Sequence, residues 1–303
     1  MHERPSIHET MIDEISVALF FLEWQMLSWS LVPADIDNLG LFLAVGSVAA
    51  MLFSMAKAGF GGSVGLLAVP LMIFACGGNS KLAIGIMLPI LIAADYVAFA
   101  AWIGKWNLRA VRMLLPGAAA GIAAGWAVLH ALNSLGGTRP EGGAVANAWL
   151  KVGVGAIALA FVALHVVRSL RGRPLTFRPV PWQATVAGAA AGASSTLAHA
   201  AGPVIAMYLL PQRMPKGQYV ASTALFFWIA NQTKLIPYFA EGMINTSTLG
   251  AGLLLVPAIA AGGLLGKLLH NRVNQAQFNG IVYGLLAIAG GWLVWQGAAG
   301  LVQ

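Results

Sequence analysis

The chain has 303 residues, of which 59% are hydrophobic and only 9% are charged. Because a soluble domain carries roughly a quarter charged residues, this composition excludes a water-soluble globular protein, and its hydrophobicity excludes a disordered one. The single cysteine, Cys76, excludes a disulfide scaffold. The composition therefore predicts an all-α membrane protein that crosses the bilayer several times.

The charged residues are distributed unevenly along the chain. Seven of the ten acids precede residue 38, whereas the rest of the chain holds all but one of the 17 Lys and Arg residues. An isoelectric point near 9.9 would suggest nucleic-acid binding in a soluble protein. Here the bases lie in short loops between apolar runs, which indicates membrane topology instead. We expect no nucleic-acid partner.

Residues 1–38 are predicted to form an acidic N-terminal extension. The first fourteen residues are acidic where a secretory signal peptide would be basic. The apolar stretch Ile15–Val32 contains Trp24 and Trp29, and indole rings favour the membrane interface. This stretch could span the membrane, but the pattern favours a helix lying in the interface.

The first predicted membrane repeat covers residues 39–168. Its second apolar run follows a glycine-rich break, Gly59-Phe60-Gly61-Gly62, and is shorter than the roughly 20 residues of a spanning helix. The apolar runs of this repeat are Leu39–Ala56, Ser63–Cys76, Leu82–Gly104, Val111–Leu132 and Ala148–Val167.

An Arg-rich linker, residues 169–182, is predicted to separate this repeat from a second one over residues 183–303. The second repeat is also interrupted early, around His199–Pro203. Its apolar runs are Gln183–Leu197, Val204–Pro211, Gln218–Ala240, Leu249–Leu269 and Phe278–Val294. Short interrupted segments at matching places in two halves predict a broken or re-entrant helix pair in each half.

The two halves resemble each other in sequence and are predicted to have opposite orientations. A Pro-x4-Gly-x3-Gly pattern starts at Pro116 and again at Pro257. Three further pairs occur at nearly the same offset, namely Gly62 with Gly202, Lys81 with Lys216, and Asn107 with Asn245. When the Arg-rich linker is placed in the cytoplasm, most other bases also fall on that side and the two halves run oppositely. Inverted repeats are typical of secondary transporters.

The two breaks are candidate anion sites. A helix that begins inside the membrane exposes unpaired N–H groups and its positive dipole end, and both favour an anion. Such helices are expected to begin near Ser63 and Val204. Gly61 and Gly62 would let a ligand approach the backbone closely. The alternative is that these glycines only permit close helix packing, which is what we expect for the other Gly-x3-Gly pairs.

Four ionisable residues lie within or beside apolar runs: Lys57, Asp95, His199 and Lys234. A charge at the bilayer centre costs roughly 2.5–3.5 kcal/mol, so such residues usually face a cavity or a partner. Three of them have a structural alternative. Lys234 could extend to the interface near Glu241, Asp95 could form a helix-packing hydrogen bond, and Lys57 could be a loop cation.

An enzyme is the weaker alternative. The sequence Gly61-Gly62-Ser63-Val64-Gly65 fits the Gly-x-Ser-x-Gly nucleophile pattern, which would make Ser63 the nucleophile of an intramembrane serine hydrolase. That pattern requires a strand–turn–helix context, whereas this sequence predicts helices only. No His-Glu-x-x-His motif is present, and we expect no metal and no cofactor.

Several of these motifs, taken together and in order, resemble the TauE/SafE family of sulfite exporters. They are the Gly59–Gly62 break followed by Val69-Pro70-Leu71, then Gly202-Pro203, then Asn231-x2-Lys234-x3-Tyr238. The resemblance covers roughly Leu39 to Trp295. It departs from the family pattern where His199-Ala200-Ala201 replaces expected glycines.

The resemblance implies a multi-pass permease of the bacterial inner membrane that moves sulfite or small organosulfonates, usually outward. By position it implies Gly61, Gly62, Gly202, Asn231 and Lys234 as substrate-site residues. We add Ser63 and His199 from the breaks, with Asp95 and Lys57 as coupling residues.

The resulting hypothesis is a carrier with a central anion site. The anion would lie between the two breaks and contact Lys234, and Asp95 is the candidate carrier of a coupling proton. Rocking of one repeat against the other would expose the site to each side in turn. A carboxylate or another oxyanion stays an alternative cargo, because helix N-termini bind any small anion.

Overall fold

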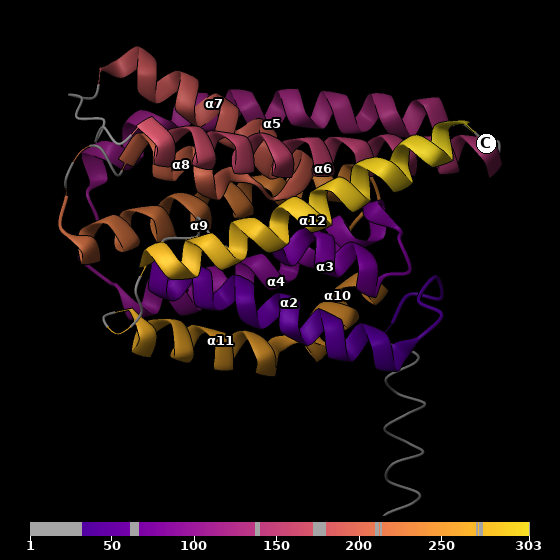
Figure 1. Cartoon of the computed structure of the whole chain (residues 1–303), viewed down its shortest axis with the longest axis horizontal. Coiled ribbons are helices and arrows are strands. Elements are labelled where there is room, and N and C mark those ends of the chain that lie inside the picture. Colours follow the sequence, from indigo (N-terminus) through magenta and orange to yellow (C-terminus); the bar gives the residue numbers. More distant parts are fainter. Residues whose placement is uncertain are drawn as a thin grey trace, which may run out of the picture.

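The computed structural model describes residues 32–60, 67–136, 140–171, 180–209, 212, 214–270, 272 and 275–302. These residues form eleven helices and no strand (Figure 1). The helices are α2 (Leu39–Phe60), α3 (Ala68–Ala75), α4 (Ser80–Ala101), α5 (Leu108–Gly136), α6 (Pro140–Arg171), α7 (Pro181–Ala198), α8 (Ala201–Leu209), α9 (Lys216–Ala240), α10 (Thr246–Leu254), α11 (Val256–Leu269) and α12 (Gln275–Val302). The expected interfacial helix and three candidate residues, Gly61, Gly62 and Ser63, lie outside the described residues.

Several of these helices are long and apolar enough to cross a membrane. Four qualify singly, namely α2, α4, residues Leu108–Ser134 of α5 and residues Ala144–Leu164 of α6. Helices α10 and α11 qualify together as a fifth span that bends by 48° between them. The chain is therefore an all-helical, multi-pass membrane protein, as its composition predicts.

Each predicted apolar run contains a helix, but two runs differ from the expectation. Helix α2 continues to Phe60, so Lys57 lies in a helix and its interpretation as a loop cation is wrong. The run Leu249–Leu269 divides at Leu255 into α10 and α11. Pro257 explains this division, because its ring nitrogen cannot donate a hydrogen bond to the preceding turn. The predicted repeat and linker boundaries stay predictions.

Both short helices fold back along their predecessors. Leu52 of α2 and Leu67 at the start of α3 line one groove. In the second hairpin, Trp182 at the start of α7 and Tyr208 at the end of α8 line one pocket. In each half, a short helix therefore runs back along the helix that precedes it.

The two halves of the chain interlock rather than lie side by side. Helix α5 packs closely on α7, and α2 packs closely on α11. At both interfaces a glycine meets the backbone of its neighbour. A side chain at Gly121 would lie 2.0 Å from the carbonyl oxygen of Ala189, and one at Gly262 would lie 2.2 Å from that of Met51. The interpretation of these Gly-x3-Gly pairs as packing contacts is confirmed, and any rocking of one half against the other must slide these interfaces.

One base predicted to face the cytoplasm, Lys216, and one predicted to face the outside, Lys81, can be placed by the contacts at the two ends of the helices. At one end, Trp102 Nε1 donates to the carbonyl of Ala58 at 3.0 Å, and the Lys216 ammonium contacts the carbonyl of His270. At the other end, Lys81 and Asn245 line a common pocket. Lys81 and Lys216 thus lie at opposite ends, as the predicted topology requires; which end faces the cytoplasm stays a prediction.

Candidate functional site

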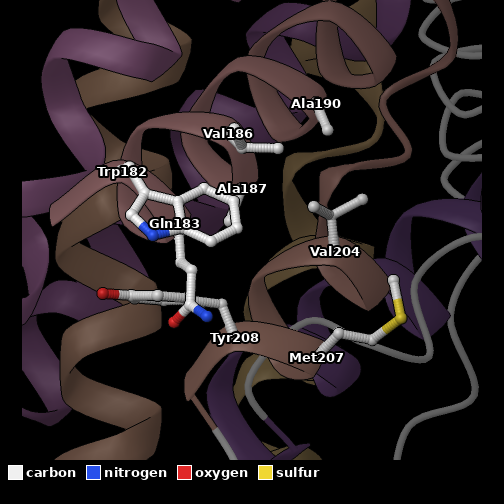
Figure 2. Close-up of a pocket in the computed structure, with 8 residues that line it drawn as sticks. All are labelled: Trp182, Gln183, Val186, Ala187, Ala190, Val204, Met207 and Tyr208. Atoms are coloured by element: carbon white, nitrogen blue, oxygen red, sulfur yellow. The ribbon is translucent and has the colours of Figure 1, made fainter. Parts of the chain in front are cut away.

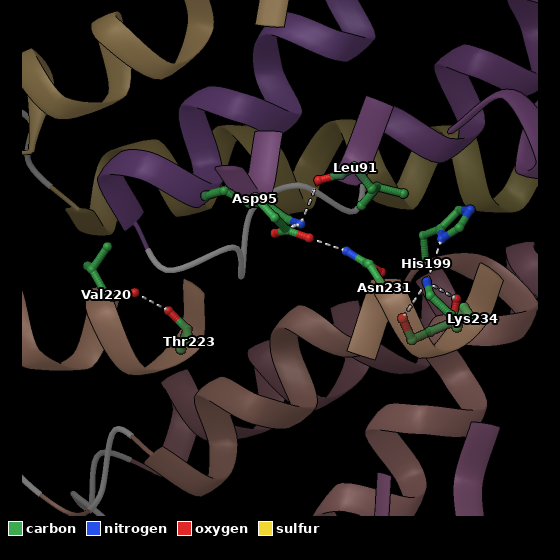
Figure 3. Close-up of polar contacts among 9 residues, drawn as sticks. Leu91, Asp95, His199, Val220, Thr223, Asn231 and Lys234 are labelled. Carbon is green, nitrogen blue, oxygen red and sulfur yellow. Dashed lines mark hydrogen bonds and ion pairs between the residues drawn. The ribbon is translucent and has the colours of Figure 1, made fainter. Parts of the chain in front are cut away.

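Two groups of buried polar side chains lie in the core and meet on helix α9 (Figure 3). The first, which we call the Lys57 cluster, consists of Lys57, Asp95 and Asn231. The second, the Lys234 cluster, consists of Lys234, Ser195 and His199. Each side chain lies within an apolar helix or at the turn of a hairpin, so its position is set by helix packing.

The Lys57 cluster is balanced in charge. The Lys57 ammonium on α2 forms an ion pair with Oδ1 of Asp95 on α4, and it donates to the carbonyl of Leu91 at 3.4 Å. The second oxygen of Asp95 accepts a hydrogen bond from the Asn231 amide at 2.5 Å. Lys57 is 2% exposed and Asp95 is 0% exposed. A fully buried pair needs such hydrogen bonds to compensate for its lost hydration.

Aromatic rings surround the cationic member of this cluster. The centroids of the Phe53 and Phe227 rings lie 4.9 Å and 5.1 Å from Lys57 Nζ. Both distances fall within the range of a cation–π interaction, which strengthens when water is absent. The ammonium is therefore stabilised by one carboxylate, one carbonyl and two ring faces.

The Lys234 cluster contains a cation and only neutral acceptors. Lys234 Nζ lies 2.9 Å from Ser195 Oγ, 3.2 Å from the Ser195 carbonyl and 3.0 Å from His199 Nδ1. His199 Nε2 lies 3.0 Å from the carbonyl of Ile84. Because a carbonyl only accepts hydrogen bonds, we assign the ring proton to Nε2, which leaves Nδ1 as the acceptor for Lys234.

The turn between α7 and α8 positions this second cluster. His199 ends α7 in the left-handed conformation with φ of 48°, and the amides of His199 and Ala200 bond to the carbonyls of Ser195 and Ser194. Among the described non-glycine residues, His199 alone has a positive φ. Such a conformation is uncommon and concentrates at functional sites. It directs the imidazole toward α9, where Lys234 lies (Figure 3).

The functional side chains of α9 share one face. Asn231, Lys234 and Tyr238 are spaced by three and four residues, which places them in successive turns on the same side. The Tyr238 hydroxyl donates to the carbonyl of Thr196 at 2.7 Å and holds α9 against α7. This spacing explains why one helix contributes to both clusters.

The structure brings together most of the predicted site residues. Lys57, Asp95 and Asn231 meet in one cluster and His199 and Lys234 in the other, while Gly202 lies buried in the first turn of α8. The interpretation of Lys234 as a residue extending to the interface is wrong, because its side chain is fully buried and bonded to α7. The predicted helix-packing hydrogen bond of Asp95 is present, to Asn231.

The sequence analysis missed Ser195. The signal was available, because Ser194, Ser195 and Thr196 form a polar run at the end of an otherwise apolar segment, directly before the break. Hydroxyls in membrane helices commonly bond to their own backbone, which Ser194 and Thr196 do here. Ser195 differs in that its hydroxyl faces Lys234 of another helix.

A pocket of about 370 Å³ lies against the α7–α8 hairpin (Figure 2). Its lining is mainly apolar, and two of its residues, Trp182 and Val186, are 66% and 58% exposed. The pocket therefore opens to the surroundings of the protein, on the hairpin rather than among the residues of the two clusters. Within the described part of the chain, no three His, Cys, Asp or Glu side chains lie close enough together to hold a metal.

Comparison with known protein families gives a match over most of the chain. The family model for the sulfite exporter TauE/SafE matches residues 42–293. The chain belongs to the TauE/SafE family. No curated protein and no solved structure matches it significantly. Membership of TauE/SafE indicates a membrane exporter of sulfite or a related anion, and a transporter family argues against the alternative of a hydrolase acting through Ser63.

Proposed function

We propose that this TauE/SafE protein exports sulfite or a small organosulfonate anion across the bacterial inner membrane by alternating access. The observation that carries the proposal is the charge of the buried core. In the described core the buried Lys, Arg, Asp and Glu side chains are Lys57, Asp95 and Lys234, that is, two amino groups and one carboxyl group. Only Lys57 has a carboxylate partner.

An anion beside Lys234 would remove this imbalance. An ammonium buried without a counter-ion is costly in a low-dielectric interior, so a bound anion lowers the free energy of the core. Sulfite and sulfonate groups carry three acceptor oxygens, which can replace the neutral acceptors that Lys234 now uses. The amide of Asn231 and the first N–H groups of α8 near Gly202 supply further donors.

Protonation of Asp95 would couple anion binding to a proton. A neutral carboxyl group no longer pairs with Lys57, which then becomes a second cation available to the anion. Binding of the proton and binding of the anion therefore favour each other, and this reciprocity is a requirement of thermodynamic linkage.

Equivalent contacts in the two halves support the inverted repeat. Each half contains a helical hairpin, and Asn107 and Asn245 have the same role, because the side chain of each accepts a hydrogen bond from the first turn of the following helix. Asp95 and Asn231 each lie fifteen residues after the first residue of their helix, α4 and α9, and bond directly to each other. A contact between equivalent positions is what a two-fold axis between the halves would produce.

The decisive experiment is sulfite efflux from proteoliposomes containing the Lys234→Met variant. Methionine keeps the length of the side chain but removes its charge, so we expect efflux to fall to the level of protein-free vesicles. The matched control is Lys267→Met, which removes an exposed cation at the end of α11 and should keep the wild-type rate. Wild-type efflux with Lys234→Met would contradict the proposed site.

Coupling is tested separately with Asp95→Asn, which keeps the shape of the side chain. We expect the variant to lose the pH dependence of efflux that the wild-type protein shows. An unchanged pH profile would exclude Asp95 as the carrier of the proton, without affecting the proposed anion site.

Thermal stabilisation of the purified protein identifies the cargo. Ligands that bind the folded state raise its apparent stability in proportion to saturation. We expect sulfite and short sulfonates to raise the unfolding temperature more than carboxylates of equal charge. The reverse order would favour the alternative cargo, a carboxylate.

A further inference from the structure

A site with an apolar part and a polar part lies on the face of the α2–α3 hairpin that points away from the Lys57 and Lys234 clusters. Its apolar part, the α3–α12 groove, has a volume of about 510 Å³. The groove is lined by Val48, Leu52, Leu67, Pro70, Leu71, Phe74, Ile288, Ala289 and Trp292. Helix α12 crosses obliquely over this part of the protein (Figure 1).

The groove continues into a pocket that contains a cation. This Lys151 pocket, of about 540 Å³, shares Phe74 and Trp292 with the groove and adds Lys151, Trp295 and Gln296 among its lining residues. The rings of Phe74 and Trp292 contact each other edge to face, with centroids 6.1 Å apart. The two hollows therefore form one site with an apolar end and a polar end.

Lys151 supplies a basic group at this polar end. Its ammonium lies over Gly78 in the turn after α3, so close that a side chain there would lie 3.2 Å from Nζ. Within the described part of the chain the two ion pairs are Lys57–Asp95 and His130–Glu241, so no described carboxylate neutralises Lys151. A phosphate group would complement it.

The polar end lies at the level expected for lipid headgroups. The turn that contains Gly78 joins α3 to α4 at the helix ends, and the nearby Trp149 and Trp295 are 50% and 70% exposed. Trp149 lies within three turns of the start of α6 and Trp295 within two turns of the end of α12, and tryptophans near helix ends are enriched at the membrane interface. From Phe74 back to Leu67, α3 extends about 10 Å toward the middle of the bundle, which is the direction an acyl chain takes.

We propose that this face binds an anionic glycerophospholipid, with its phosphate at Lys151 and one acyl chain in the α3–α12 groove. A basic pocket between transmembrane helices that adjoins an apolar groove matches both parts of such a molecule. The lipid would join α12 to the α2–α3 hairpin. This inference does not depend on the nature of the exported anion.

The test is native mass spectrometry of the full chain in detergent with added phosphatidylglycerol or phosphatidylcholine. One lysine near a headgroup predicts that the wild-type protein retains the anionic lipid about fivefold better than the zwitterionic one. Lys151→Met should reduce this ratio to about one. The matched control Lys81→Met removes another cation from the same end of the bundle but from a different pocket, and it should keep the ratio.

A second variant tests the groove itself. Ala289→Phe adds a ring to its lining and should lower the retention of both lipids; if that variant does not give a monodisperse protein, Ala289→Ile adds less volume at the same position. An unchanged ratio in Lys151→Met, or unchanged retention in the Ala289 variant, would overturn the proposal. So would displacement of the lipid by millimolar inorganic phosphate, or a dimer that forms through this face without lipid.

Discussion

The two buried lysines have opposite electrostatic surroundings although they lie in the same core. Lys57 contacts a carboxylate, a carbonyl and two aromatic rings, whereas the hydrogen-bond acceptors of Lys234 are a hydroxyl, a carbonyl and a neutral imidazole. The first arrangement is complete without a ligand. The second leaves a positive charge that an anion can neutralise. We therefore propose that the Lys234 cluster binds the cargo, while the Lys57 cluster stabilises the fold as long as Asp95 is ionised.

The largest expected effect comes from breaking the balanced cluster. Asp95→Leu leaves Lys57 as an unpaired buried cation, and such changes cost about 3–5 kcal/mol in the free energy of unfolding. The double variant Lys57→Met/Asp95→Leu replaces both charges by apolar groups and should recover most of this loss. Unfolding of the purified variants in detergent measures both values. Equal losses in the single and double variants would contradict the role given to the ion pair.

Removing the unbalanced cation should not destabilise the fold in this way. Lys234→Met removes a buried charge that has no carboxylate partner, together with its desolvation cost, so we expect the free energy of unfolding to stay the same or to rise. Export should nevertheless stop. If the same unfolding assay gives a loss as large as that of Asp95→Leu, the proposed difference between the two lysines is wrong.

Two variants of His199 test the backbone conformation of the turn and the chemistry of the side chain separately. Glycine adopts the observed φ of 48° without strain, whereas alanine in the left-handed region costs roughly 1–2 kcal/mol. His199→Gly should therefore be more stable than His199→Ala by about that amount. Both variants remove the acceptor of Lys234 and should slow sulfite efflux to a similar degree. Wild-type efflux in His199→Gly would show that the imidazole does not position Lys234.

The smallest expected effect on stability comes from Glu241, a carboxylate at the end of α9. It lies outside the two buried clusters and serves as a comparison for them. Glu241 accepts hydrogen bonds from Trp126 Nε1 at 2.9 Å, His130 Nδ1 at 3.0 Å and Asn133 Nδ2 at 2.5 Å. Burial raises the pKa of Glu241, but the three hydrogen bonds outweigh it and hold the pKa below its ordinary value of 4.5.

A carboxylate with a lowered pKa stabilises the fold above its ordinary pKa, and this contribution is lost as the pH falls through the lower, folded-state value. We therefore expect the unfolding temperature of the wild-type protein to decline below about pH 4.5, and that of Glu241→Gln to decline less. Parallel pH profiles for the two proteins would exclude this contribution.

The sequence predicts the helices well because each one is built around an apolar run. It also predicts the two short helices α3 and α8, since runs such as Val204–Pro211 are too short to span a membrane. The division at Leu255 was not predicted. Pro257 lies at the start of a new helix there, whereas Pro116, at the matching place in the first half, lies inside the continuous helix α5. The effect of a proline on a helix depends on the packing around it, which a single sequence does not contain.

The candidate site was predictable residue by residue but not as an arrangement. Asp95 and Lys234 stand out because charges within apolar runs are costly. Their partners are distant in the sequence, as the contacts of Asp95 with Lys57 and Asn231 show. Which lysine receives the carboxylate depends on the packing of α2 and α9 against α4, and hydropathy patterns do not specify that packing.

The glycine contacts described above have a mechanical consequence. Gly121 ties a helix of the first half to one of the second, and Gly262 does the same on the other side of the molecule. A backbone seated directly on a backbone leaves little room for sliding. We therefore propose that the two bodies that move during alternating access each combine helices from both halves of the chain: one contains α2 and α11, the other α5 and α7.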